Sequence, residues 1–139
     1  MQVSREVELA WCAGFFDGEG HVSYHRGYPS KMSGCVSAQM FANVPQCSDN
    51  IEVLEKFQRI VGLGKLLGPY KTAKKPKHVL TFGIKEVQPL FLMLKPYLGK
   101  EKTEDFQRAI LAFDMHSSIP TPDDYARLAK RDNKRLSPR

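Results

Sequence analysis

The residues most able to do chemistry are two acids, Asp17 and Glu19, which close an apolar stretch, CAGFFDGEG. Hydrophobic spacing and acids in the first turn predict a helix over residues 5–17, which Gly20 ends. The carboxyl end of a helix already carries partial negative charge, so two acids there need a positive partner. Because carboxylate oxygens suit Mg²⁺, we expect a divalent metal at this end. The alternative is a turn in which both acids are simply solvated.

The body of the same predicted helix is apolar on every side. Residues 9–16, LAWCAGFF, contain no charged side chain, and such a helix must be covered all round. In a chain of 139 residues the core covers one side, so we expect a second copy of the protein on the other. Gly14 and Gly18 form a GxxxG spacing that lets two helices approach backbone to backbone. The sequence therefore predicts a homodimer.

The composition points to a polyanionic partner. The formal net charge of +6 favours nucleic acid first and an anionic membrane second. No apolar run is long enough to cross a bilayer, so we expect no membrane partner. Three cysteines without a close pair indicate a reducing, intracellular compartment rather than a disulfide framework. An origin in an organelle, a bacterium or a phage is not distinguished.

Two histidines, His21 and His25, have the H-x₃-H spacing of zinc ligands on a helix. Their surroundings, however, have the pattern of a strand, in which residues four apart lie about 13 Å from one another. We therefore do not expect them to share a zinc ion.

Alternating and helical patterns order the rest of the chain. Strands are predicted at 21–27, 34–44, 64–70 and 78–84, and further helices at 49–62, 86–95 and 103–115. This order predicts an α+β domain, an antiparallel curved sheet with helices on one face and a polar face left open. We assign residues 1–117 to this domain, and residues 118–139 to a short terminal helix and basic tail of the same domain.

The segment Cys12–Gly20 resembles the signature of the LAGLIDADG homing endonucleases. Four of its residues match that signature letter for letter, namely Ala13, Gly14, Asp17 and Gly20. Glu19 stands where the signature has its second aspartate, and Cys12 is the least usual substitution. The order αββαββα over about residues 5–115 also agrees with the family. Because the chain contains a single motif, it resembles the homodimeric branch.

The resemblance implies a site-specific DNA endonuclease that makes a metal-dependent, staggered double-strand break at a long pseudo-palindromic target. Glu19, beside Gly18, would bind Mg²⁺ or, in its place, Mn²⁺. Gln46, after the second strand, would order water, and Lys100 is the best match to the family's lysine, with Lys102 as its rival. Asn50 stands where the family has a basic residue. The expected dimer interface consists of Ala10, Ala13, Gly14, Asp17 and Gly18.

In the same resemblance the sheet would lie in the major groove of double-stranded DNA. From the alternation, the expected DNA-contacting residues are Ser23, His25, Tyr28, Lys31, Ser37, Gln39, Asn43, Lys65 and Thr81. The loop after the third strand adds the phosphate-holding candidates Lys71, Lys74, Lys75 and Lys77. A solvated charged face is the alternative for these lysines. The tail residues Lys130, Arg131, Lys134, Arg135 and Arg139 either follow the DNA backbone or are disordered.

Two other functions are compatible with parts of this pattern. The first keeps the fold without cleavage, as an intron maturase or a DNA- or RNA-binding regulator. The second is an unrelated basic binding module in which the motif match is chance. Glu19, Gln46 and Lys100 together argue for the nuclease, and intron or intein homing would be its setting.

Overall fold

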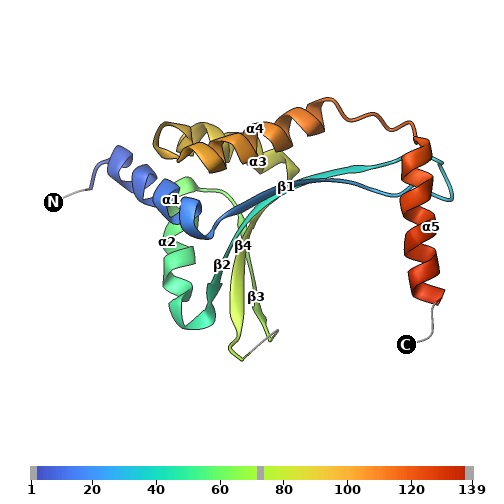
Figure 1. Ribbon diagram of the computed structural model, residues 1–139. Helices are drawn as coiled ribbons and strands as arrows, with labels where there is room; N and C mark the ends of the chain where they lie inside the picture. Colours follow the sequence, from blue (N-terminus) through green and yellow to red (C-terminus); the bar gives the residue numbers. More distant parts are fainter. Residues whose placement is uncertain (1–2, 72–73, 137–139) are drawn as a thin grey trace.

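The computed structural model of the chain describes residues 3–71 and 74–136 (Figure 1). Its elements run in the order α1 (Arg5–Glu19), β1 (His21–Arg26), β2 (Ala38–Cys47), α2 (Ile51–Val61), β3 (Lys65–Tyr70), β4 (Lys77–Phe82), α3 (Ile84–Leu94), α4 (Lys100–Asp114) and α5 (Pro122–Leu136). Short 3-10 turns at Ser48–Asn50 and Lys95–Tyr97 precede α2 and follow α3. The predicted α+β class and the order αββαββα are confirmed.

The four strands form one antiparallel sheet in the order β1-β2-β4-β3. In its register Ala42 lies opposite Phe82 and Val44 opposite Leu80, and all four side chains are fully buried. Helices α1–α4 cover this apolar face, whereas the other face of the curved sheet stays open (Figure 1). The predicted alternation of β2 between a packed and a polar face is therefore confirmed.

An aromatic cluster joins α1 to α3 and α4. The Phe16 and Phe106 ring centroids lie 5.1 Å apart, and Phe91 stacks on Phe106 at 5.0 Å. Burying each ring contributes about 1.5–3 kcal/mol. Gly20 ends α1 directly over this cluster, where an added Cβ would lie 2.4 Å from the Phe16 ring. The glycine is needed because no side chain fits between the turn and the ring.

β2 begins and ends later than the alternation alone predicts. The preceding residues form a compact loop in which the Gly34 amide donates to the Ser30 carbonyl, with Gly34 at φ +72°. Ser37, expected inside the strand, therefore precedes it. Pairing with β4 continues to Cys47, so that Gln46 lies within the strand rather than after it.

The C-terminal helix is longer than expected, because no proline or glycine interrupts the described chain after Pro122. Four of the five basic residues assigned to a tail therefore belong to α5, namely Lys130, Arg131, Lys134 and Arg135. The fifth, Arg139, lies outside the described residues. The helix stands apart from α1–α4, at the far end of the β1–β2 hairpin (Figure 1). Its first turn carries Asp123 and Asp124 and its last turn basic residues, which suits the helix dipole.

One buried carboxylate fastens α5 to the sheet. Asp124 accepts from Arg26 Nε at 2.8 Å, from Arg127 at 2.6 Å and from the Thr121 amide at 2.7 Å. The Arg26 guanidinium holds the pKa of this carboxyl well below its usual range, so it stays charged in mildly acidic solution. The connecting segment is fixed by His116, which bonds to the Tyr24 hydroxyl at 2.8 Å and to the Val36 carbonyl at 2.9 Å.

In the described part of the chain, no helix has the length and apolar content needed to cross a membrane.

Cys12 faces the core rather than solvent, and burial raises the pKa of its thiol to about 12. Because the thiolate is the reactive form, we expect Cys12 to resist a disulfide-exchange reagent at pH 8 in the native protein. Exposed Cys35 should react first, and all three cysteines should react in denaturant. Labelling followed by peptide mass mapping measures this. Equal native labelling rates for Cys12 and Cys35 would contradict the packing of α1.

Candidate active site and nucleic-acid interface

The end of α1 opens onto a surface cavity of about 340 Å³. Glu19, the last residue of the helix, lines it together with Gln46 and Cys47 of β2. Lys75, just before β4, and Lys77, its first residue, also line the cavity. Gln46 Oε1 accepts from the Cys47 amide at 3.1 Å, and its NH₂ group has no partner among the described residues. The structure therefore brings together an exposed carboxylate and a free amide donor, as the sequence analysis expected of Glu19 and Gln46.

A single protomer offers an incomplete set of metal ligands at this cavity. In residues 3–71 and 74–136, no group of three or more His, Cys, Asp or Glu side chains is placed to hold a metal ion. Glu19 is a hard oxygen ligand of the kind that Mg²⁺ prefers, and Mg²⁺ commonly keeps several waters and binds through one or two carboxylates plus phosphate. The residues at this cavity thus fit a metal ion whose remaining ligands come from outside the protomer.

Asp17 has a different role from Glu19. Both of its carboxylate oxygens lie 3.0 Å from the amide nitrogen of Gly99, the N-cap residue of α4. A carboxylate at a helix N-terminus accepts from unpaired amides and suits the dipole. Asp17 therefore ties the end of α1 to the start of α4 within one protomer, and does not face the Glu19 cavity.

The expected catalytic lysines lie in the first turn of α4, not in the preceding loop. Lys100 and Lys102 follow Gly99 directly, because the Asp17 contact starts the helix there. Neither residue lines the Glu19 cavity, so the two do not join Glu19 and Gln46 there.

The lysines at the Glu19 cavity are Lys75 and Lys77, which the sequence analysis assigned only to phosphate contacts on a loop. Lys77 lies near Gln46 because it pairs with Cys47 across β2 and β4. This proximity can be predicted only when the register of the two strands is known. Lys75 Nζ lies 4.0 Å from Asp49 with both side chains exposed, an arrangement that contributes little energy.

The open face of the sheet carries a row of polar residues across all four strands. His21 pairs with Asn43, Asn43 with Thr81, and Thr81 with Lys65. Residues paired directly across antiparallel strands share a face, and this row is offset by one residue from the buried Ala42 and Phe82. Three expected DNA contacts, Asn43, Thr81 and Lys65, therefore lie side by side.

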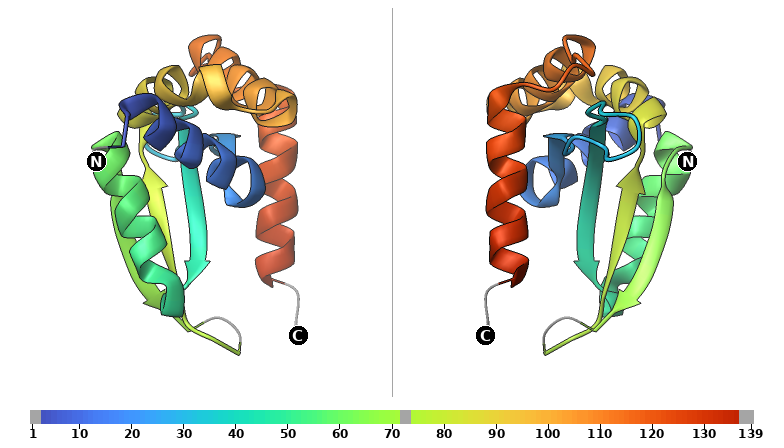
Figure 2. Two further views of the ribbon diagram at one scale, coloured as in Figure 1. Left: turned by 90° about the vertical axis from the view of Figure 1, so that its left-hand side faces the viewer. Right: turned by 90° about the vertical axis from the view of Figure 1, so that its right-hand side faces the viewer.

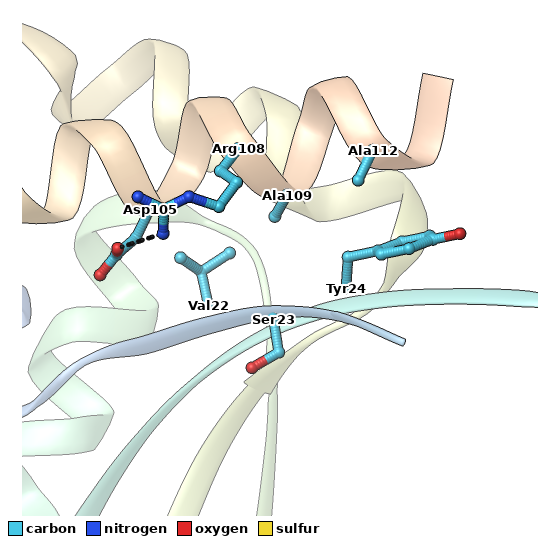
Figure 3. Close-up of a pocket in the computed structure, with 7 residues that line it drawn as sticks. All are labelled: Val22, Ser23, Tyr24, Asp105, Arg108, Ala109 and Ala112. Carbon is cyan, nitrogen blue, oxygen red and sulfur yellow. Dashed lines mark hydrogen bonds and ion pairs between the residues drawn. The ribbon is translucent and has the colours of Figure 1, made fainter. Parts of the chain in front are cut away.

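The outer part of this face continues along β1 and β2. Ser23 pairs with Phe41 and His25 with Gln39, and the His25 ring stacks on Phe41 at 5.5 Å. Figure 3 shows the reason for the alternation: Val22 and Tyr24 point toward α4, whereas Ser23 turns away from it. The two inward residues help to line a cavity of about 240 Å³ beneath Ala109 and Ala112. Ser23, His25 and Gln39 therefore lie on the open face, as expected.

The remaining expected contacts lie at the tips of the two hairpins. Lys31 and Ser37 are exposed near the tip of the first hairpin, and Lys71, Lys74 and Lys75 are exposed around the second. Tyr28 is 39% exposed, because its ring packs against Arg131 of α5 with the guanidinium 4.3 Å from the ring centroid. Most of the polar set therefore occupies one side of the sheet, and Tyr28 also contacts α5.

The outer side of α1 is bare. Ala10, Gly14 and Gly18 are exposed, and a Cβ built on either glycine meets no atom within 4 Å. Ala13 is an exception among the expected interface residues, because it is fully buried in the protomer's own core. The helix therefore buries Cys12, Ala13 and Phe16 inside the chain and leaves a stripe of small residues for another surface.

Neither a protein-family model nor a curated protein sequence matches the chain. Solved structures do match it. The homing endonuclease I-CvuI, in complex with the I-CreI target and Mg, aligns over 91% of this chain and 76% of its own, with a TM-score of 0.62 and 19% identity. The chain has the LAGLIDADG homing endonuclease fold.

Two further structures with the LAGLIDADG fold were solved on DNA. The group I intron-encoded I-CeuI aligns over 98% of this chain at a TM-score of 0.64 and 18% identity. The LAGLIDADG meganuclease I-AabMI, bound to uncleaved DNA, aligns over 91% at 0.61 and 22%. The chain spans 63% of the I-CeuI chain and 41% of the I-AabMI chain.

The contact between Asp17 and Gly99 predicts a stability effect that is separate from metal binding. Asp17→Ala removes the acceptor for a helix N-terminal amide and should lower the free energy of unfolding by about 1 kcal/mol. Denaturant titration followed by circular dichroism measures the change. Asp114→Ala, at the exposed carboxyl end of α4, is the matched control and should not destabilise the chain. An unchanged stability in Asp17→Ala would remove this residue from its capping role.

Proposed function

We propose that this chain is a homing endonuclease which acts as a homodimer and makes a metal-dependent, staggered double-strand break at a long pseudo-palindromic DNA target. The observation that carries the proposal is the shared cavity of Glu19 and Gln46 at the edge of an open, polar sheet face. The intron-encoded and DNA-bound proteins of the same fold support it by analogy. Its setting would be intron or intein homing, in a reducing compartment of an organelle, a bacterium or a phage.

The homodimer in this proposal uses the bare stripe of α1. Two α1 helices packed through Ala10, Gly14 and Gly18 would approach closely, because no side chain separates their backbones. The carboxyl ends of the helices would then bring the two Glu19 side chains toward the two-fold axis. A two-fold dimer presents the same polar face twice, which matches a target with two similar half-sites.

In the proposed reaction Glu19 and the Gly18–Glu19 backbone would hold Mg²⁺, or Mn²⁺, on the scissile phosphate. When bound, the cation supplies charge stabilisation for the phosphate and makes water more acidic. The free NH₂ group of Gln46 would orient the attacking water. A lysine would offset the developing negative charge on the phosphate, with Lys75 and Lys77 nearest the cavity and Lys100 or Lys102 at the start of α4.

DNA in this proposal lies against the open face. Asn43 and Gln39 carry amides that can pair with adenine edges, and Lys65 can donate to guanine. Ser23, His25 and Thr81 discriminate less, and the exposed lysines of the β3–β4 hairpin hold phosphates. Binding should therefore weaken steeply as salt rises.

The carboxylate of Glu19 gives the most direct test of cleavage. Glu19→Gln keeps the size of the side chain but removes its charge, so cutting in Mg²⁺ should fall about 1000-fold or more, the effect of losing several kcal/mol of metal-assisted catalysis. Binding to DNA in Ca²⁺, measured by fluorescence anisotropy, should be retained. Glu55→Gln, on the exposed side of α2, is the matched control and should cut normally. Normal cutting by Glu19→Gln would overturn the assignment, and DNA binding without cutting by the wild type would favour a maturase or regulator.

The bare stripe of α1 gives the test of the dimer. A Cβ at Gly14 has no atom of the protomer within 4 Å and the residue is exposed, so Gly14→Leu should fold normally but separate two packed helices. A strain of about 1–3 kcal/mol in each half of a two-fold interface should raise the dimer dissociation constant about 30-fold or more. Analytical ultracentrifugation measures it, with Gln107→Leu on exposed α4 as control. Dimers of undiminished affinity in Gly14→Leu would contradict this interface.

A further inference from the structure

We infer that α5 and the tip of the β1–β2 hairpin form a second phosphate-binding surface, which holds the DNA backbone beyond the segment that the sheet contacts. We call this the outer clamp and define it as Tyr28, Arg127, Lys130, Arg131 and Lys134. The inference rests on the proposed DNA-binding function and adds a surface to it. Three of these residues, Lys130, Arg131 and Lys134, were expected from the sequence to belong to a tail that either follows the DNA backbone or is disordered.

The outer clamp is a fixed structure rather than a loose tail. Asp124, only 2% exposed, is bonded to both Arg26 of β1 and Arg127 of α5. The Arg26 guanidinium also donates to the Ser117 and Ile119 carbonyls at 2.8 and 3.0 Å, which fixes the segment before the helix. Because Arg26 belongs to a paired strand, the orientation of α5 follows that of the sheet.

The face that α5 turns toward the hairpin is strongly basic. Its four cations follow the spacing 127, 130, 131 and 134, so they lie on one side of the helix. Together with Tyr28 they line a surface cavity of about 490 Å³. The Tyr28 ring supports two of them, with the Arg127 and Arg131 guanidinium carbons 5.3 and 4.3 Å from the ring centroid. The cavity thus has a rigid aromatic wall and a cationic lining.

The positive charge of the outer clamp is not neutralised within the described residues. Arg127 is paired with Asp124, and Arg131 approaches Asp132 at 3.4 Å, but Lys130 and Lys134 have no acidic partner there. Like charges four residues apart on one helix face, such as Lys130 and Lys134, repel each other slightly. A polyanion that lies across both lysines would remove this repulsion and release its counterions.

The position of the clamp selects DNA among the polyanions. α5 and the β3–β4 hairpin project to the same side of the sheet, the side left open by α1–α4 (Figures 1 and 2). α5 stands at the end of the β1–β2 hairpin opposite to α1, where the proposed dimer has its centre (Figure 1). A duplex that runs along the open face away from that centre therefore meets the clamp last. Lysines and arginines there contact phosphates and position the duplex without reading its sequence.

The test compares salt dependence in the full-length protein. The double variant Lys130→Ala/Lys134→Ala is titrated against a 40-base-pair mixed-sequence duplex, and the dissociation constant is followed from low to high KCl. Each lost phosphate contact lowers the slope of log K against log salt by about 0.9, so we expect a drop of about 3.6 for four contacts per dimer. Lys130→Arg/Lys134→Arg should restore the wild-type slope. Hydroxyl-radical footprints should shorten at both outer ends and stay unchanged at the centre.

The matched control is Lys85→Ala/Lys95→Ala, which removes two exposed lysines from the helix-covered side and should leave slope and footprint unchanged. A wild-type slope and footprint in Lys130→Ala/Lys134→Ala overturn the outer clamp alone, while the sheet interface stands. Absence of any salt-dependent DNA binding by the wild type overturns the proposed function and the clamp together. Loss of binding to phosphatidylserine vesicles, with DNA binding unchanged, would reassign the surface to a membrane and overturn the inference as well.

Discussion

The carboxyl end of α1 is held on the body of the chain at two points, and both the proposed dimer contact and the proposed metal site use this helix. Phe16 packs against Phe106 beneath Gly20, and Asp17 accepts from the amide that starts α4. With Phe16 in the core, the opposite side of the helix is left bare and Glu19 is left at the rim of a cavity. One packing arrangement thus sets the bare side of α1 that we propose as the dimer surface, the position of Glu19 and the entry into β1.

The charges of the molecule are distributed in keeping with this arrangement. Two acids hold elements of the chain together: half-buried Asp17 bonds to the start of α4, and buried Asp124 bonds to Arg26 and Arg127. Lysines also line two surface cavities, Lys75 and Lys77 beside Glu19 and Lys130 and Lys134 on α5. Part of the net charge of +6 is therefore concentrated at two places on the surface, and a rod-like polyanion such as DNA could contact both.

Local patterns were sufficient to predict what depends on neighbouring residues. The alternation of Met40, Ala42 and Val44 with polar residues marked both faces of β2, and the apolar stretch ending at Gly20 marked α1. The pairing of Glu19 with Gln46 followed from a family resemblance rather than from periodicity. It agrees with the cavity that the two residues share.

Features that depend on long-range contacts could not be predicted in this way. In the apolar part of α1, no polar residue indicates which side of the helix faces the core. Ala13 was therefore assigned to the dimer surface although it lies in the core. Lys100 was expected in a loop, because the capping contact of Gly99 comes from Asp17, 82 residues away. The attachment of α5 to the sheet was not predicted, because it depends on a carboxylate–arginine contact across 98 residues rather than on an apolar stripe.

In the proposed function, two copies of this chain cut a near-palindromic duplex through their Glu19 cavities. The most direct measurement is selection of cleaved ends from a library of long randomised duplexes, incubated with the full-length protein in Mg²⁺ and sequenced at both termini. We expect enriched ends with a constant stagger, centred on a two-fold sequence, which are absent when EDTA is present. Ends that are not enriched above the EDTA sample, although the protein binds the library, would contradict the proposed function.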